Sequence, residues 1–360
     1  MKQLATVLAL LLLFACSGAP VREAPTSATQ PLSASLARAP GWVESPLNVS
    51  ITVFSDSNAV NGRSVPVREA ERRYLPMELR QALNESGFWG AVRVVPAPDP
   101  GAELAVYGEI VASDGVELVL DITAVDATGL TWLKRRYADS ATDHAYNDES
   151  SALREPFDDL FNAIANDLST LLSAQPPENR QTVLKAATLK YAAALSPEAF
   201  AGFLREDEDG VLQVAALPAR NDSMYSRANR IRESENRFVD LIDEQYEQIY
   251  QRMQTPYAYW RRFGYELIQY NRRIAATGGD ASARGYEAMK DIYQTYQDSR
   301  MNQDELRELT RSFAAEVAPT VTQVAGRVVQ LTGSLENQYD EWRSLMRQFY
   351  DVERGNGASP

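Results

Sequence analysis

Cysteine and histidine are almost absent from this chain. The 360 residues include one cysteine, Cys16, and one histidine, His144. One cysteine excludes an internal disulfide, and one histidine in a polar stretch without a nucleophile motif argues against a Ser-His-Asp hydrolase. A metal site built from His144 with Asp139, Asp143 and Asp148 is the weaker alternative, because zinc sites recruit more nitrogen or sulfur ligands. We therefore predict no catalytic residues, no metal site and no cofactor.

Long hydrophobic runs are also missing. The longest apolar stretch, from Leu4 to Phe14, follows Lys2 at the extreme N-terminus. It is too short to cross a bilayer as a helix, which takes about 20 apolar residues. A charged residue followed by a short apolar run is typical of a secretory signal peptide, which we assign to residues 1–15.

The end of this run is Leu13-Phe14-Ala15-Cys16, which resembles the lipobox of bacterial lipoproteins. The resemblance implies cleavage before Cys16, thioether lipidation of its sulfur and acylation of the new amino group. Multiple acyl chains on one residue give a firm anchor, because each buried methylene contributes about 0.8 kcal/mol. In this class a serine after the cysteine, here Ser17, implies sorting to the outer membrane of a diderm bacterium, facing the periplasm. The alternative is an ordinary signal peptide that leaves Cys16 free.

Positive charge is scarce relative to negative charge. The net charge is −13, and removal of residues 1–15 deletes one lysine, Lys2, which takes it to −14. Such an acidic chain is a poor partner for nucleic acid, whose binding depends on neutralised phosphates. We predict no nucleic-acid partner, and a membrane contact through the lipid anchor only.

Composition divides the remaining chain into segments. Residues 16–46 are rich in Ala, Pro, Ser and Thr, which predicts a flexible linker after the lipidated cysteine. We expect an α+β domain over residues 47–175, a helical bundle over 178–352 and a disordered tail over 353–360. Two domains are expected because a chain of this length is longer than a single hydrophobic core usually supports.

The predicted α+β domain has alternating strands and two helices. Strands are predicted over residues 47–54, 88–96, 103–113, 116–127 and 131–140, with helices over 68–87 and 153–173. The order is β-α-β-β-β-β-α, which predicts a small sandwich with helices on one face of a sheet.

Residues 103–132 carry a Gly108-containing strand, a hairpin, and then Asp126-Ala127-Thr128-Gly129 with Trp132. This pattern resembles the α/β domain shared by several bacterial envelope proteins. They include lipoprotein activators of peptidoglycan synthases, the curli secretion lipoprotein and the N-terminal domain of the Tol–Pal β-propeller protein. The resemblance covers about residues 47–135 and implies a binding or assembly domain.

The C-terminal half shows helical spacing of apolar residues with short breaks. Helices are predicted over residues 222–252, 257–275, 281–299, 303–331 and 335–350. The helix over residues 303–331 is predicted partly from Val317, Val321, Val324 and Val328, which recur at steps of three or four. The pattern predicts an all-α antiparallel bundle.

The most distinctive stretch of this half is TPYAYWRRFGYELIQYNRR. It gives a candidate binding surface of Tyr257, Tyr259, Trp260, Arg261 and Arg262, because aromatics with arginines are typical of interface hot spots. The alternative, which the helical spacing favours, is that the rings are buried in the bundle core.

These observations predict a non-enzymatic, lipid-anchored envelope protein that serves as a binding, assembly or regulatory factor. Its partner would be an envelope protein or peptidoglycan. Two alternatives stay open: a cell-wall glycan hydrolase that uses a carboxylate pair, and a passive structural lipoprotein that contacts peptidoglycan.

Overall fold

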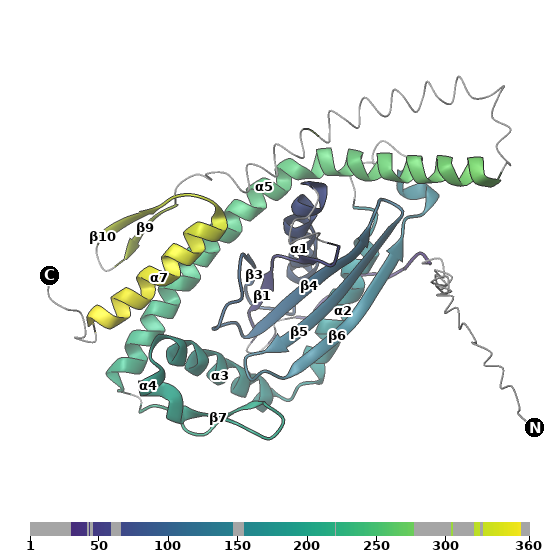
Figure 1. The fold of residues 1–360 in the computed structure, drawn as a ribbon. Coiled ribbons are helices and arrows are strands. Elements are labelled where there is room, and N and C mark those ends of the chain that lie inside the picture. The colour runs from purple at the N-terminus through teal and green to yellow at the C-terminus, as the bar shows by residue number, and fades with distance from the viewer. Residues whose placement is uncertain are drawn as a thin grey trace, which may run out of the picture.

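The computed structural model describes residues 30–41, 43, 46–58, 66–146, 155–219, 221–276, 304, 320–324 and 327–353. Figure 1 shows a mixed sheet with helices packed on it and a long helix along one side, so the α+β class is confirmed. Within the described residues, no helix is both long and apolar enough to cross a membrane.

The central sheet has the order β3-β1-β4-β5-β6, and the short β2 pairs with β4. Its strands are β1 (Val49–Thr52), β2 (Ser55–Asp56), β3 (Val92–Val95), β4 (Leu104–Ser113), β5 (Glu117–Asp126) and β6 (Thr131–Ser140). β1 runs parallel to β3 and β4, while β4, β5 and β6 form an antiparallel meander. In β5, buried and half-buried residues alternate throughout, as expected when one face of a sheet is covered and the other is open.

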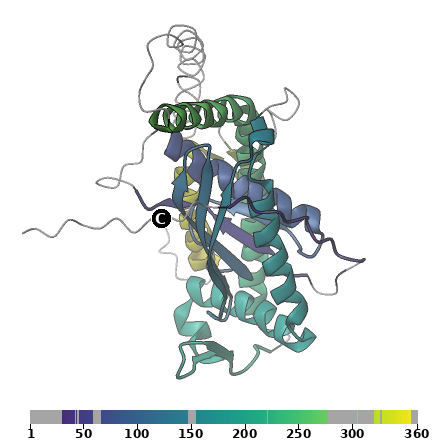
Figure 2. The same ribbon diagram turned by 90° about the vertical axis from the view of Figure 1, so that its right-hand side faces the viewer.

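Helices α1 (Pro66–Ser86) and α2 (Asp158–Ala174) cover that buried face. In Figure 1 both lie behind the meander, and Figure 2 shows the same packing after a quarter turn. Leu75, Leu79 and Leu83 of α1 are fully buried, as are Leu160 and Ile164 of α2. This order of elements agrees with the one predicted from the alternation and spacing of apolar residues.

The segment before β1 differs from the prediction. Residues 30–41 were assigned to the flexible linker, yet the main chain here is hydrogen-bonded to the body of the protein. The Leu32 N–H donates to Asp139 Oδ1 at 2.7 Å, and the Ala37 N–H donates to Asn166 Oδ1 at 2.7 Å. The side-chain Nδ2 of Asn162 donates a hydrogen bond to the Ala34 carbonyl oxygen at 3.0 Å. Polar side chains of α2 and β6 therefore hold this segment in an extended form.

The second half contains helices α3 (Pro177–Leu195), α4 (Pro197–Phe200), α5 (Ser223–Ala276) and α7 (Leu335–Glu353). One helix, α5, replaces the two predicted over residues 222–252 and 257–275, and Pro256 lies inside it. α5 contacts α1, α3, α7 and β3, and α7 runs alongside it (Figure 1).

The prediction of an all-α C-terminal half is wrong at two places. β7 (Leu204–Glu206) pairs with β8 (Leu212–Val214), and β9 (Thr320–Val324) pairs with β10 (Arg327–Leu331). The second hairpin occupies the end of the helix predicted over residues 303–331. Its β-branched valines and threonines favour strands, and their spacing of three or four misled the helical prediction. The predicted helix over 281–299 lies outside the described residues.

Buried residues of both predicted domains belong to one contiguous hydrophobic cluster. It includes Ile51 and Leu79 from the sheet and α1, together with Phe238, Tyr246 and Trp342 from α5 and α7. The long helix α5 therefore shares one hydrophobic core with the sheet and with its helical neighbours.

Candidate functional site

A cleft of about 430 Å³ opens between α1, the start of α2, α5 and the extended segment 30–41. Most of the residues that line it are polar or aromatic. They are Leu36, Arg38, Tyr74, Glu78, Gln81, Ala82, Glu85, Glu155, Asp158, Phe161, Asn162, Tyr250 and Gln254. A concave site formed by several elements with convergent polar groups is the usual setting of a ligand site, and we take it as the candidate functional site.

Glu78 is the central acidic group of the cleft. It lies on α1 on the same side as Tyr74 and Ala82, and the residue is 8% exposed. The Tyr250 hydroxyl donates to Glu78 Oε1 at 2.9 Å. Burial and, after it, the nearby Glu155 raise the pKa of Glu78 to about 8, although the hydroxyls of Tyr74 and Tyr250 oppose the shift. None of the main causes is a cation, so the carboxyl group holds its proton at neutral pH.

Glu155 lies just before α2, and its side chain is 4% exposed. Burial raises the pKa of Glu155 to about 7, although Arg261 lowers it in part. The Arg261 Nη2 and Glu155 Oε1 atoms are 3.5 Å apart, which is an ion pair. Glu155 Oε1 accepts no hydrogen bond from any of the residues that the structure describes.

Arg261 lies behind Glu155 and is completely buried. Its guanidinium stacks over the rings of Phe157 and Tyr257, with the Cζ atom 4.6 and 4.8 Å from the two ring centroids. Burial disfavours its charged form, but Glu155, Tyr257 and Glu71 outweigh burial and raise the pKa of Arg261. The arginine therefore stays charged and partly neutralises Glu155, whereas Glu78 has no such partner.

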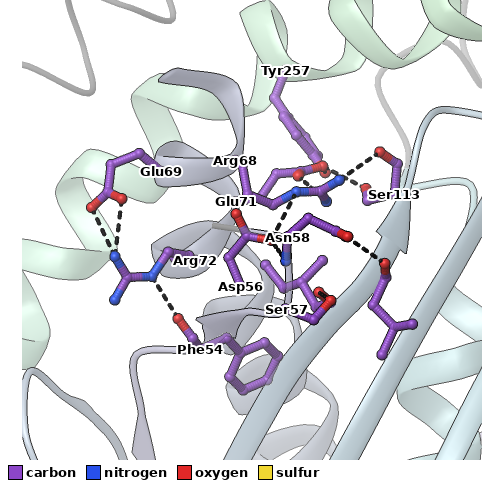
Figure 3. A network of polar contacts seen from close by, with 12 residues as sticks. Phe54, Asp56, Ser57, Asn58, Arg68, Glu69, Glu71, Arg72, Ser113 and Tyr257 are labelled. Carbon is purple, nitrogen blue, oxygen red and sulfur yellow. Dashed lines mark hydrogen bonds and ion pairs between the residues drawn. The ribbon is translucent and has the colours of Figure 1, made fainter. Parts of the chain in front are cut away.

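A second polar network joins α1, β4 and α5 around Glu71 (Figure 3). Glu71 of α1 accepts hydrogen bonds from Arg68 at 2.6 Å, Ser113 at 2.5 Å and Tyr257 at 2.8 Å. These donors come from α1, β4 and α5. Arg68 also lies 3.8 Å from Asp56 in β2. The network fixes α5 against α1 and the sheet, and thus fixes Tyr257 and Arg261 beside Glu155.

The candidate binding surface predicted from the aromatic–arginine stretch does not form one surface. Tyr257 and Arg261 are buried, and Trp260 is half-buried against the core. Tyr259 is 47% exposed, and Arg262 forms an ion pair with Glu266 at 2.9 Å. Residues four apart share one face of a helix, so Tyr257 and Arg261 both face inward, while Tyr259 points to solvent. Tyr257 and Arg261 therefore cannot contact a partner directly, which corrects that part of the prediction.

The residues of the envelope-domain pattern have local structural roles. A Cβ atom on Gly108 would lie 2.5 Å from the ring of Phe54, so only glycine admits this ring against β4. Asp126 accepts hydrogen bonds from the Thr128 hydroxyl at 2.5 Å and from Trp132 Nε1 at 2.8 Å. These contacts shape the turn between β5 and β6 and place the pattern outside the cleft.

Several predicted positions receive no test from the structure. Cys16 and Asp148 lie outside the described residues, and the same holds for the tail from residue 354. Asp139, a candidate metal ligand, instead accepts the Leu32 N–H. Among the described residues, no group of three or more His, Cys, Asp or Glu side chains has the arrangement of a metal site.

Sequence reasoning missed the carboxyl pair of the cleft. Glu78 lies between Met77 and Leu79 in α1, and both of these neighbours are buried. A carboxyl group at such a position could have identified Glu78 as a candidate site residue from the sequence. Glu155 precedes its helix in an acidic stretch, and only the fold brings it beside Arg261.

No family model matches this chain, and no curated protein matches it either. Two solved structures resemble parts of it. One is protein XCC0632 of family DUF330 from Xanthomonas campestris, with 13% identity, 43% of this chain and 99% of that chain covered, and a TM-score of 0.27. The other is a PelC dodecamer from Paraburkholderia phytofirmans, with 15% identity, 39% and 98% covered, and a TM-score of 0.22. Similarity at this level carries no argument about function.

Proposed function

We propose that this chain is a lipid-anchored protein of the bacterial outer membrane that faces the periplasm and binds another envelope component without catalysing a reaction. The signal-like run and the Leu13-Phe14-Ala15-Cys16 sequence support the anchor and the location. The observation that carries the binding role is the cleft, which is formed by helices α1, α2 and α5 and contains a buried acid without a cationic partner.

Site-specific photo-crosslinking in intact cells tests this role. A photoreactive amino acid replaces Gln81 or Gln254, which line the cleft and are exposed. The matched control carries it at Val352, which is 64% exposed on α7 and does not line the cleft. We expect a discrete adduct from the cleft positions and none from the control. Absence of adducts at both cleft positions, or the same adducts at all three, would contradict the proposal.

A specific observation also favours a second candidate, the two-carboxylate glycan hydrolase. Glu78 and Glu155 line one cleft, with pKa values raised to about 8 and about 7. A protonated acid beside a partly ionised one is the pairing that glycoside hydrolysis uses, with Glu78 as the general acid. The test is release of soluble fragments from purified sacculi by the full lipidated chain. Hydrolysis that is lost in both Glu78→Gln and Glu155→Gln would establish the enzyme and overturn the binding role.

A further inference from the structure

We propose that α2 and β6 form a groove for an extended peptide, that residues 30–41 of the same chain fill it, and that an extended segment of a partner protein takes their place. The inference rests on the proposed binding role and deepens it, because Leu36, Arg38 and Asn162 of this region also line the cleft. It makes the bound envelope component a protein. It follows from the hydrogen bonds, the spacing and the burial of the residues on both sides of the groove.

The groove binds the main chain of its occupant. Asn166 of α2 brackets Leu36, because its Oδ1 accepts the Ala37 N–H at 2.7 Å and its Nδ2 donates to the Ser35 carbonyl oxygen at 2.9 Å. One carboxamide thus satisfies the two main-chain groups on either side of a residue in an extended chain. Such a pair of bonds does not depend on the side chains of the occupant.

The spacing of two asparagines matches an extended chain. Asn162 donates to the Ala34 carbonyl oxygen at 3.0 Å, and Asn166 brackets Leu36, two residues further along. Four residues of an α-helix rise about 6 Å, and two residues of an extended chain span about 6.6 Å. Another peptide in an extended form would therefore meet the same donors and acceptors.

Asp139 of β6 lies at the other end of the groove. The residue is 3% exposed, and its Oδ1 accepts the Leu32 N–H at 2.7 Å. Burial raises the pKa of Asp139, and the Leu32 N–H opposes that shift. A buried acceptor that loses a donor is costly, so the groove favours an occupant that supplies a main-chain N–H at this position.

Alternate side chains of the occupant face the protein. Leu32, Ala34 and Leu36 are half-buried, whereas Ser33 and Ser35 between them are exposed. Both leucines pack against the main hydrophobic cluster. When a protein binds an extended peptide, main-chain hydrogen bonds give affinity and alternate side chains give specificity. The groove therefore selects two leucines four positions apart with a small residue midway between them.

The extended segment has the features of an exchangeable element. None of residues 30–41 is buried, and none belongs to a strand. Segments with little buried surface open at a lower free-energy cost than the core does. A partner segment has to compete with an occupant on the same chain, whose effective concentration is about millimolar. Weakening the resident segment should therefore expose the groove to a peptide added in solution.

Fluorescence anisotropy on the full chain in non-ionic detergent tests the inference. The probe is a labelled peptide with the sequence of residues 30–41, QPLSASLARAPG. The receptor is the double variant Leu32→Ser, Leu36→Ser, whose own segment lacks both apolar contacts. We expect the probe to bind this receptor at least about tenfold more tightly than it binds the wild-type chain. A control probe with serine at both leucine positions should not bind.

A further substitution in this receptor identifies the groove. Asn166→Ala removes both bonds that bracket residue 36 and should weaken probe binding by about tenfold or more. The matched control Asn179→Ala removes an exposed amide of α3, which donates to Gln175, and should leave the affinity unchanged. Thermal melts show which variants are folded. Unchanged binding in folded Asn166→Ala, equal binding of both probes, or no binding to the folded receptor would overturn the inference.

Hydrogen exchange of the wild-type chain gives a test that needs no variant. The amides of residues 30–41 should exchange at least about tenfold faster than those of α2 near Ile164 and Leu168, which are buried. Excess unlabelled peptide should make their exchange faster still, because it displaces the segment. Equal rates in the segment and in α2 would mean that the segment leaves only when the whole protein unfolds, and would overturn the inference.

A second copy of this chain is the alternative occupant, since it carries the same segment. Sedimentation equilibrium of the wild-type chain distinguishes the two. A monomer at all concentrations agrees with a different protein as the partner. A concentration-dependent dimer that Asn166→Ala abolishes would identify the second copy and overturn the different protein.

The two proposals can fail separately. Discrete adducts at Gln81 or Gln254 in cells, together with no probe binding, would leave the binding role intact and refute the peptide groove. Adducts that contain no second protein would do the same. Probe binding without any cleft adduct would support the groove and refute an envelope component beside the cleft.

Discussion

The replacement Glu78→Gln should stabilise the protein at high pH and not at low pH. Glutamine has nearly the same shape as glutamic acid, and its Oε1 atom can still accept the hydrogen bond from the Tyr250 hydroxyl. The variant therefore removes only the capacity of Glu78 to ionise. Burial and the nearby Glu155 raise the pKa of Glu78 in the native protein to about 8, whereas the ordinary pKa of a Glu side chain is 4.5.

The sign follows from proton binding. Between pH 5 and 8 the unfolded chain has this group ionised and the native protein has it protonated, so unfolding releases a proton. The free energy of unfolding then falls by about 1.4 kcal/mol for each pH unit. Stability from this group is complete below pH 4.5 and is lost as pH rises through the native pKa. The variant should be close to the wild type at pH 5 and exceed it by about 4 kcal/mol at pH 8.

Urea unfolding of the full chain at pH 5, 6, 7 and 8 measures this difference. Other acids with raised pKa values, such as Glu235 and Asp243, act equally in both proteins and cancel. The exposed Glu244→Gln control should stay parallel to the wild type. A Glu78→Gln difference that does not change with pH would mean that Glu78 is already ionised in the native cleft, and the reasoning would fail.

Three further predictions concern other parts of the chain. Arg261→Ala leaves Glu155 buried without its cation, so this variant should lose about 3–5 kcal/mol of unfolding free energy in urea. The double variant Arg261→Met, Glu155→Gln removes both charges and should lose much less. Equal losses in the two variants would refute the ion-pair argument. Gly264→Ala would place a Cβ atom 2.5 Å from the Asp114 carbonyl oxygen, so it should destabilise the protein by about 1–3 kcal/mol. In an ordinary helix the same replacement is stabilising. A gain in stability would therefore contradict the close packing at this position. Cys16→Ser should move the protein from the membrane fraction to the soluble periplasmic fraction, and unchanged fractionation would refute lipid anchoring.

Much of the sheet and its helices could be predicted because each depends on local patterns. The alternation in residues 116–127 indicates a strand with one buried face, and β5 has that burial. Leu75, Leu79 and Leu83 recur at helical spacing, and α1 buries all three. In both cases the period of the apolar residues and the period of the backbone coincide.

Other parts could not be predicted because the deciding contacts lie far apart in the sequence. Residues 320–331 have valine spacing compatible with a helix, but pairing of β9 with β10 makes them a hairpin. Residues 30–41 have a linker-like composition, but Asn162, Asn166 and Asp139 supply partners for the main chain. A local pattern contains no information about such distant partners.

The sequence by itself determined the alternation of the strands, the apolar faces of α1 and α2, and the strong excess of negative charge. The tertiary structure alone decided which carboxyl groups have a raised pKa. Glu78 and Glu155 are 77 positions apart in the numbering, yet packing of α1, α2 and α5 encloses both in one cleft and places Arg261 behind only one of them. The physical reason is that the pKa of a carboxyl group depends on its burial and on its neighbours in space, which the order of residues does not show.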